Sequence, residues 1–306
     1  MTVVAALVQV LGGVALGPLL VGAVQSAKAR LQGRRGPSPL QPYRDLRRLW
    51  GKSAADPQPT TVVYRLAPCL VAAATALALL LLPIAGEAPD WSLGNDALVV
   101  VGLLALGRFA LAASSWDTGS GFSLMGSARD LTFAPFAEAL LLLALVVAAL
   151  PAGSTDLVAM SAAAAGWSVW AEPAHWCGAA AFALVVLVET GRQPIDNPDT
   201  HLELTMIHEG PLLEYAGRDL ALIQWSAAAR HWLVLVLAAE LFAPHRGGFW
   251  EQLGWLALAL PTLCAALALT ETAQAKMRIL RVPGLLAGGC ALALIGLVSA
   301  LVGGLV

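Results

Sequence analysis

The sequence has few charged residues. Of its 306 residues, 12% are Asp, Glu, Lys or Arg, whereas 58% are hydrophobic and the mean hydropathy is +0.73. Soluble domains carry about 25% charged residues, so this composition cannot cover a water-exposed surface. The net charge is only −2, and the lack of a basic excess excludes nucleic acid binding on electrostatic grounds. We therefore expect a protein whose solvent is the lipid bilayer.

Cysteine is scarce and shows no metal-binding pattern. Cys69, Cys177, Cys264 and Cys290 lie in or beside apolar runs, and no two of them form a CxxC pair. This spacing predicts neither a zinc site nor an iron–sulfur cluster in this chain. The first apolar run has no basic segment before it and no small-residue cleavage site after it. We therefore expect a membrane helix there and not a cleaved signal peptide.

Eight long apolar stretches are present. A spanning helix needs about 20 mostly apolar residues, because it crosses about 30 Å of hydrocarbon at about 1.5 Å per residue. Lipid cannot pair backbone polar groups, so these stretches should be α-helical. We expect an all-α polytopic membrane protein that forms one integral membrane domain over 1–306. The expected spans are 3–24, 62–83, 97–114, 131–151, 174–190, 220–242, 252–271 and 284–306.

Positive charges fall on alternate loops. The loop at 25–61 holds eight Lys or Arg, whereas the loop at 84–96 holds none. The positive-inside rule therefore places alternate loops in the cytoplasm, beginning with 25–61, and with eight spans both termini lie outside. The weakly apolar segment 155–172 is either a surface helix or a poor ninth span. The expected cytoplasmic loops are 25–61, 115–130, 191–219 and 272–283.

Several charged residues lie within the expected spans. A charge at the centre of a membrane helix costs ~2.5–3.5 kcal/mol on insertion scales, so such residues usually face the protein interior or a wet cavity. We expect a functional role for Glu138 and Arg230, because neither lies close to an interface. We expect Arg65, Arg108 and Glu271 to snorkel to an interface or to pair internally, without such a role.

The charged residues expected in the outer half of the membrane, and the histidines, give a weaker indication of function. Glu240 lies towards the outer end of the sixth span, and we expect His175 and His245 to be solvated near the outer surface. His201 and His208 are seven residues apart and could share one helix face. No cysteine or closer ligand pair accompanies them, so a metal site is not predicted.

The longest acidic segment is the loop 189–219, which holds seven Asp or Glu between two expected spans. Glu189 and Arg192 are three residues apart and should be neighbours on one helix face. Pro194 should stop that helix, and a short surface helix is expected to begin near Thr200. Loops outside the packed scaffold tend to carry function. This one is therefore either a functional surface or merely a solvated acidic connection.

The first cytoplasmic loop is basic and rich in proline. Its Gly and Pro residues at 36–42 should fix a rigid turn, and 43–50 should form a basic amphipathic helix. Such a helix either lies on anionic lipid or forms a docking surface for a soluble partner. The residues expected on that docking surface are Arg34, Arg35, Gly36, Pro37, Gln41, Tyr43, Arg44 and Asp45.

Three motifs, spread over the whole chain, resemble one family of membrane subunits. They are ARLQGRRGPSPLQPYRDLRRLWGK in the first loop, GSARDLTFAPFAE at the start of the fourth span, and ETGRQPIDNPDTHLELTMIHEGPLLEYAG in the fifth loop. The chain is similar to the membrane subunit shared by respiratory complex I, as its NADH dehydrogenase subunit 1, and by group 4 membrane-bound nickel–iron hydrogenases. The resemblance is closer to the hydrogenase branch, which contains formate hydrogenlyase and hydrogenase 4.

The resemblance implies a subunit that anchors a soluble redox arm in a bacterial or archaeal plasma membrane. Its acidic residues would begin a charged path towards antiporter-like membrane subunits that move protons or sodium ions. Arg129 and Arg192 would favour the charged form of the carboxylates. The residues implied on this path are Glu138, Glu189, Asp196, Glu203, Glu209, Glu214, Arg129, Arg192, Arg230 and Glu240.

The resemblance implies no redox cofactor in this chain. The nickel–iron centre and the iron–sulfur clusters would lie in partner subunits, namely the large and small hydrogenase subunits and an iron–sulfur subunit. One alternative is a quinone-site subunit of a complex I-type NADH dehydrogenase. A second is an independent transporter, which the lack of an inverted repeat disfavours. A third is a structural anchor whose intramembrane charges are only paired.

Overall fold

The computed structural model is built of helices. It describes residues 7–9, 11–54, 57–87, 94–196 and 207–303, and no strand forms within these ranges. The α-helices are α2 (Gly17–Leu31), α3 (Gln41–Trp50), α4 (Val62–Leu80), α5 (Ala97–Thr118), α6 (Gly121–Ala149), α7 (Leu157–Ala164), α8 (Trp167–Ala171), α9 (Pro173–Glu189), α10 (Gly217–Phe242), α11 (Phe249–Ala273) and α12 (Val282–Val302). Short helical turns are η1 (Gly12–Leu16), η2 (Leu150–Ala152), η3 (Gly210–Leu212) and η4 (Ile279–Arg281).

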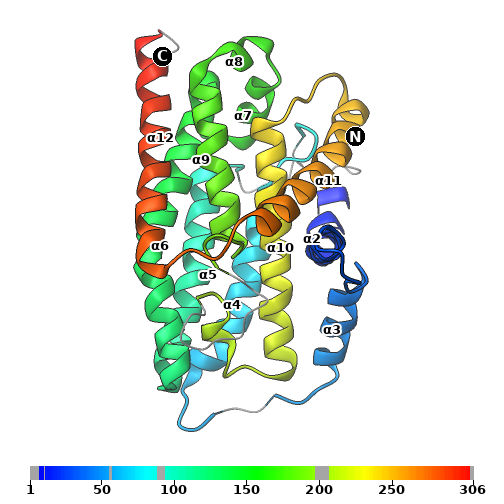
Figure 1. The fold of residues 1–306 in the computed structure, drawn as a ribbon, viewed down its shortest axis with the longest axis vertical. Coiled ribbons are helices and arrows are strands. Elements are labelled where there is room, and N and C mark those ends of the chain that lie inside the picture. The colour runs from blue at the N-terminus through cyan, green and yellow to red at the C-terminus, as the bar shows by residue number, and fades with distance from the viewer. Residues whose placement is uncertain (1–6, 10, 55–56, 88–93, 197–206, 304–306) are drawn as a thin grey trace.

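Among the described residues, seven helices are long and apolar enough to cross a membrane. The expected span 174–190 corresponds to α9, which is also apolar but has 17 residues. The prediction of an all-helical, multi-pass membrane fold is confirmed. Segment 155–172 folds into the short helices α7 and α8 at one end of the bundle, so it is not a ninth span (Figure 1).

The expected loop at 115–130 is not a loop. Helix α5 continues to Thr118 and α6 begins at Gly121. The polar residues at the end of α5 have a structural use, because the Asp117 carboxylate accepts hydrogen bonds from the backbone N–H groups of Thr61 (2.8 Å) and Tyr64 (3.1 Å) at the start of α4. A run of polar residues in the sequence therefore marks a helix cap and not an irregular connection.

Helix α10 is the centre of the bundle (Figure 1). It packs against α2, α3, α4, α9 and α11. Of its most apolar window of 18 residues, 67% is buried inside the protein, compared with 28% for α11 and for α12. Every residue from His231 to Leu241 is buried. Side chains on α10 are therefore placed towards the interior and not towards lipid.

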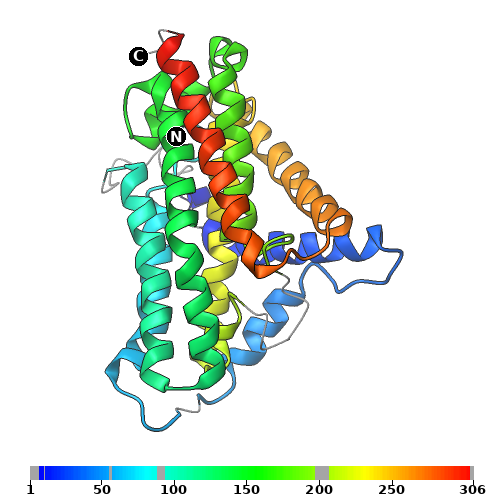
Figure 2. The same ribbon diagram turned by 60° about the vertical axis from the view of Figure 1, so that its left-hand side comes forward.

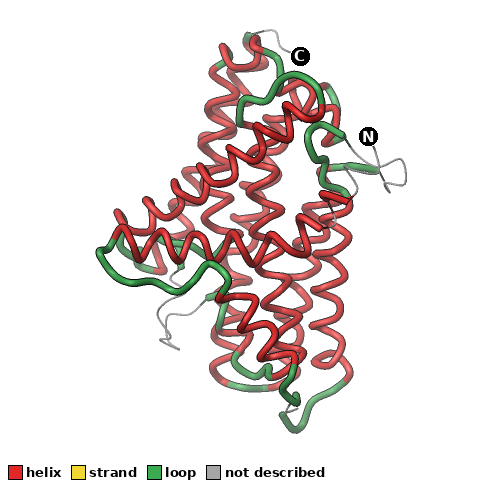
Figure 3. The backbone as a smooth tube through the Cα atoms, turned by 90° about the vertical axis from the view of Figure 1, so that its right-hand side faces the viewer, coloured by secondary structure: helices red, strands yellow, loops and turns green. Residues whose placement is uncertain are grey.

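Helices α2 and α11 do not follow the bundle axis. Figure 2 shows α2 running across the bundle and α11 strongly tilted, and Figure 3 shows the same arrangement from another side. Glycine permits the crossing of α2 over α10, since a Cβ atom on Gly17 would lie 2.6 Å from the carbonyl oxygen of Ala228. The two tilted helices meet the start of the acidic loop, where Glu271 on α11 pairs with Lys28 on α2 and with Arg192.

A second close contact joins α6 to the loop before α10. A Cβ atom on Gly126 would lie 2.6 Å from the Cα atom of Gly210. We predict that Gly126→Ala destabilises the protein by about 1–3 kcal/mol, because backbone at this distance cannot yield as a side chain could. The measurement is thermal unfolding of the purified protein in detergent. Gly102→Ala is the control, since its Cβ atom would meet open space; equal effects of the two changes would contradict the prediction.

Candidate functional site

One arginine gathers three carboxylates at membrane depth. Arg108 on α5 donates from Nη1 to Glu138 Oε1 on α6 (2.9 Å) and from Nη2 to Glu189 Oε1 at the end of α9 (2.7 Å). Its Nε lies 3.8 Å from Asp130 Oδ2 on α6. The Arg108 side chain is 5% exposed and that of Glu189 is 1% exposed, whereas that of Glu138 is 36% exposed. Because three helices supply the groups, only the folded bundle forms this cluster.

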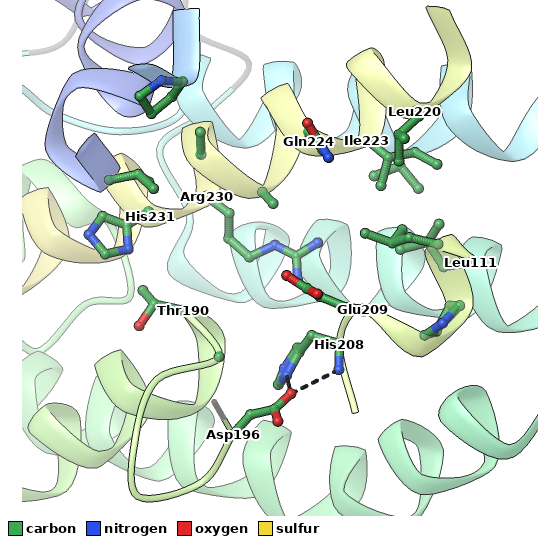
Figure 4. Close-up of a pocket in the computed structure, with 18 of the residues that line it drawn as sticks. Leu111, Thr190, Asp196, His208, Glu209, Leu220, Ile223, Gln224, Arg230 and His231 are labelled. Atoms are coloured by element: carbon green, nitrogen blue, oxygen red, sulfur yellow. Dashed lines mark hydrogen bonds and ion pairs between the residues drawn. The ribbon is translucent and has the colours of Figure 1, made fainter. Parts of the chain in front are cut away.

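A second arginine completes this group. Arg230 Nη1, on α10, lies 3.9 Å from Glu189 Oε2, so the Glu189 carboxylate is held between two guanidinium groups. The Glu209 carboxylate points towards the Arg230 guanidinium (Figure 4). We refer to Arg108, Asp130, Glu138, Glu189 and Arg230 as the Arg108 cluster. Burial of this many charges is tolerated only because opposite charges alternate within it.

The acidic loop folds back on itself at Asp196. Its carboxylate accepts backbone N–H bonds from Ile207 (3.3 Å) and His208 (3.2 Å), and Oδ2 lies 3.2 Å from His208 Nδ1 (Figure 4). Lys276 Nζ donates to Asp196 Oδ1 (2.9 Å) from the segment after α11. His208 Nε2 also lies 4.0 Å from Asp130 Oδ1. The loop is thereby joined to the Arg108 cluster.

These contacts shift the proton affinities of the loop residues. Burial alone raises the pKa of Asp196, but the hydrogen bonds from His208 and Lys276 outweigh it and hold that pKa below its ordinary value. Burial alone lowers the pKa of His208, but the hydrogen bond to Asp196 and the charge of Asp130 hold it above its ordinary value. The contact therefore favours the carboxylate form of Asp196 and the imidazolium form of His208.

A separate group of charges lies at the ends of the tilted helices. Glu271 on α11 pairs with Arg192 Nη1 (2.9 Å, to Oε1) and with Lys28 Nζ on α2 (3.0 Å, to Oε2). The Glu271 side chain is fully buried. We refer to Lys28, Arg192 and Glu271 as the Glu271 triad. Arg192 was expected to share a helix face with Glu189. Helix α9 instead ends at Glu189, before Pro194, and Gly191 turns the chain with φ +60°.

A cavity of about 600 Å³ lies beside these charges. Its polar wall includes Arg108, Glu189, Arg192, Arg230 and His231. Its other walls are mainly apolar and come from α2, α3, α4 and the start of α10. A cavity of this size with few but strongly polar groups on one side is typical of a ligand or water-filled site.

Two stacked tyrosines close the apolar end of the cavity region. The rings of Tyr64 and Tyr215 lie 4.5 Å apart at an interplanar angle of 3°. The Tyr64 hydroxyl donates to the Glu214 carbonyl oxygen (2.8 Å), and the Tyr215 hydroxyl donates to the Tyr64 carbonyl oxygen (3.1 Å). Burial raises the pKa of Tyr215 to about 12. The backbone of Glu214 thus has a structural role, and its side chain is not part of the Arg108 cluster.

Glu240 belongs to a different site. It accepts hydrogen bonds from the backbone N–H groups of Ala85 (2.9 Å) and Gly86 (3.3 Å) and from Ser161 Oγ (2.8 Å). His245 Nε2 lies 2.9 Å from the carbonyl oxygen of Ser161. Glu240, Ser161 and His245, which we call the outer cluster, join three connections at the far end of α10. Glu240 therefore lies apart from the other carboxylates of the predicted path.

The expectation that His175 and His245 are solvated is wrong. Both are buried, with 6% of their surface exposed. His245 is held by the outer cluster, and the ring of His175 packs against the aromatic rings of Trp170 and Phe242. The position of His175 in the sequence did not reveal this burial, because the residues that cover it, on α8 and α10, are brought there only by the fold.

The first loop forms the predicted amphipathic helix as α3. Gln41 Nε2 donates to Asp45 Oδ1 (3.0 Å), and the Tyr43 hydroxyl donates to the carbonyl oxygen of Ala15. A Cβ atom on Gly36 would lie 2.4 Å from Ala29 Cβ, so glycine lets the turn pack on α2. Of the residues predicted on the docking surface, Arg34, Arg35, Gly36, Pro37 and Arg44 are exposed.

The predicted path residues are only partly brought together. Glu189, Asp196, Glu209 and Arg230 line the cavity, and Glu138 is joined to Glu189 through Arg108. Arg192 joins the Glu271 triad. Glu203 lies outside the described residues, as do Thr200 and His201. The guanidinium bonded to Glu138 belongs to Arg108 and not to Arg129, whose guanidinium contacts Met125 Sδ (3.9 Å).

The sequence-based selection missed several central residues. Arg108 and Glu271 are internally paired, as expected, but they organise the two charge groups and are not peripheral. The further residues missed are Lys28, Asp130, His208 and Lys276. A usable signal existed for Arg108, because a cation within an apolar span needs a buried partner, whereas Lys28 lies beyond the expected span 3–24. No three His, Cys, Asp or Glu side chains of the described residues are placed to hold a metal ion.

The fold and the site together define a multi-pass helical membrane protein with a buried charge network beside a cavity. The chain belongs to the NADH dehydrogenase family of membrane subunits, since the family model matches residues 2–301. The sequence is 31% identical to formate hydrogenlyase subunit 4 of Escherichia coli (strain K12), over 98% of this chain and 99% of the relative. It is 35% identical to hydrogenase-4 component C of the same organism, over 79% and 76%.

A solved structure has the same fold. The chain superposes on a chain of the membrane-bound sulfane sulfur reductase, an archaeal respiratory membrane complex, with a TM-score of 0.84. The sequences are 20% identical, and the match covers 98% of this chain and 99% of the other. The helix arrangement is therefore shared even where few side chains are.

The Asp196–His208 contact generates a pH prediction. The pKa of His208 is raised above 6.5 in the folded protein. The contact therefore stabilises the folded protein fully below pH 6.5, and this stabilisation is lost as the pH rises through the raised pKa. We predict that Asp196→Asn lowers the titration midpoint of His208 by about one unit or more. The reason is that burial lowers the pKa of His208, and the carboxylate that opposes this effect is then absent. Histidine side-chain NMR measures the midpoint, with Glu214→Gln as control. An unchanged midpoint in Asp196→Asn would show that the contact does not form.

Proposed function

We propose that this chain is the membrane anchor and coupling subunit of a respiratory complex of the membrane-bound nickel–iron hydrogenase or formate hydrogenlyase type. The observation that carries the proposal is the Arg108 cluster, in which buried carboxylates share guanidinium groups beside a cavity. The similarity to formate hydrogenlyase subunit 4 and hydrogenase-4 component C supports the type of complex. The chain itself would hold no redox cofactor.

The loop connecting α9 to α10 is where redox events would enter the network. Asp196 and His208 tie this loop to Asp130, and so a movement of the loop changes the field at Arg108 and Glu189. Carboxylates this close have coupled protonation, because the charge of one opposes ionisation of the next. Turnover in a docked redox arm would thereby change the proton occupancy of the Arg108 cluster.

Glu138 is the residue through which the charge network would continue, within the membrane, towards a neighbouring subunit. Its side chain is 36% exposed, far more than that of Arg108 or Glu189 in the same cluster. It lies on α6, a membrane helix, so the exposed part faces a neighbour in the membrane and not bulk water. We propose that an antiporter-like subunit lies against this face and receives a proton, or an electrostatic signal that moves protons or sodium ions.

The first loop would provide the surface by which this subunit binds the soluble redox arm. The exposed Arg34, Arg35 and Arg44 form a basic surface on and before α3, while the opposite side of α3 covers the cavity through Pro42, Asp45 and Leu46. A partner bound there would contact the cavity roof directly. The proposed partners are the large and small hydrogenase subunits with the iron–sulfur subunit, on the cytoplasmic side.

Two neutralising substitutions test the coupling role. We predict that Glu138→Gln and Glu189→Gln, made singly in the assembled complex, lower the ion gradient formed per turnover roughly fivefold or more, the lower range of coupling between sites. Glutamine keeps the shape but cannot carry the charge. The measurement is hydrogen evolution from reduced viologen together with a pH-sensitive dye and a sodium assay in membrane vesicles.

Glu172→Gln is the control for these substitutions, because Glu172 is an acidic residue beside the separate cavity near His175. It should leave the gradient per turnover at the wild-type value. If both Glu138→Gln and Glu189→Gln also keep wild-type turnover and wild-type gradients, the coupling role is wrong, and an anchor with merely paired charges remains.

The cavity itself favours a second candidate, a quinone-site subunit of a complex I-type dehydrogenase. Its volume of about 600 Å³ and its apolar walls suit an amphipathic ring compound. For that candidate we expect quinone-site inhibitors to abolish turnover, and Leu111→Trp or Ile223→Trp, which narrow the cavity, to lower the affinity for quinone. In a hydrogenase-type complex neither treatment should change hydrogen evolution.

A further inference from the structure

The Glu271 triad joins parts of the chain that the Arg108 cluster does not reach. Lys28 comes from α2 and Glu271 from α11, the two helices that cross the bundle, and Arg192 comes from the turn after α9. Lys28 and Glu271 both lie within helices long and apolar enough to span the membrane. The triad therefore places a carboxylate on the side of the protein formed by α2 and α11.

Burial makes this carboxylate dependent on its two partners. The Glu271 side chain has no exposed surface, and those of Lys28 and Arg192 are 9% and 5% exposed. A buried carboxylate that loses a cationic neighbour favours the neutral, protonated form, because the low-dielectric interior no longer offsets its charge. Arg192 and Lys28 are thus the groups that balance the charge of Glu271.

Arg192 connects the triad to the cavity. It lines the cavity together with Glu189, Arg230 and His231, and it follows Glu189 by three residues on the turn that Gly191 forms. Three buried atoms of this wall have no protein hydrogen-bond partner among the described residues, namely Arg192 Nε, Arg230 Nε and His231 Nε2. A cavity of about 600 Å³ with charged groups on its wall has room for water, and water can exchange protons.

The turn that carries Arg192 is also attached to the segment that follows α11. The backbone N–H of Met277 donates to the carbonyl oxygen of Pro194 (2.8 Å), and Lys276 binds Asp196. A movement of the loop at Asp196 therefore acts on Arg192 and on the end of α11 together. The Arg192–Glu271 contact is the place where such a movement is converted into a change of charge pairing.

We propose that Glu271 is a second proton-exchanging carboxylate of the coupling network, on a branch that runs from the cavity through Arg192 towards α2 and α11. When Arg192 moves away, Glu271 takes a proton from cavity water; when Arg192 returns, the proton goes back to water. This inference rests on the proposed coupling function. It adds a second route for protons, which leads towards α2 and α11 and away from the face of α6 that carries Glu138.

The test uses the assembled complex in membrane vesicles, with reduced viologen as the electron source. We expect Glu271→Gln to keep hydrogen evolution and assembly but to lower the ion gradient per turnover roughly fivefold or more. Glu271→Asp, which retains an ionisable group, should recover most of that loss. Glu251→Gln is the matched control, because Glu251 lies on the same helix, is exposed and is far from the triad in sequence.

A second variant covers the case in which Glu271→Gln does not assemble. The double change Lys28→Met with Glu271→Gln removes both charges, so no cation is left without its partner on α2; it should assemble and show the same loss of gradient per turnover. A purely structural triad would instead lower assembly and turnover while the gradient per turnover stays at the wild-type value, and that result would overturn the proposal.

The branch and the coupling function can fail separately. If Glu189→Gln lowers the gradient per turnover but Glu271→Gln does not, the branch through Arg192 is refuted and the coupling function stands. If neither Glu189→Gln, Glu138→Gln nor Glu271→Gln has an effect, the coupling function itself fails, and the branch fails with it.

Discussion

The constraint on which the structure depends is the placement of ionised side chains at membrane depth. A charge removed from water is tolerated only where opposite charges and hydrogen bonds replace its hydration. Arg108 meets this requirement for three carboxylates at once, and Arg230 supports the most buried of them, Glu189. Removing one partner of such a pair costs about 3–5 kcal/mol, because the other charge remains buried. The helices α5, α6, α9 and α10 are therefore held in register by charge as well as by packing.

Helix α10 separates the Arg108 cluster from the outer cluster. Between Arg230 and Glu240, helix α10 runs for ten residues, about 15 Å, and its side chains from Trp232 to Ala239 are apolar or aromatic and buried. This stretch separates the Arg108 cluster from the outer cluster around Glu240. A proton that enters the Arg108 cluster meets other charges sideways, on α5, α6 and α9, and none directly above it on α10. The Arg108 cluster thus has charged neighbours laterally and none along α10, as the proposed lateral coupling requires.

The acidic loop is the element that unites these parts. It is fastened at Asp196 by His208 and Lys276, it positions Arg192 against Glu271, and its end forms the tyrosine stack beside α4. His208 belongs to the loop itself, whereas Lys276, Glu271 and Tyr64 tie its described parts to the segment after α11, to α11 and to α4. That is the property expected of an element that receives a signal from a soluble arm and distributes it within the membrane.

Hydropathy and charge in the sequence determined the helical membrane fold, because the bilayer leaves a chain this apolar few alternatives. The sequence also identified Glu138, Glu189 and Arg230 as unusual, since a charge within an apolar run is conspicuous. It could not show that Arg108 and not Arg129 binds Glu138, that Arg192 turns away from Glu189 to Glu271, or that Glu240 binds the backbone N–H of Ala85. Those pairings join residues 30 to 155 positions apart. They follow from the crossing of α2 and α11, the turn at Gly191 and the helix-to-helix contacts at glycine, so only the tertiary structure decided which charges meet.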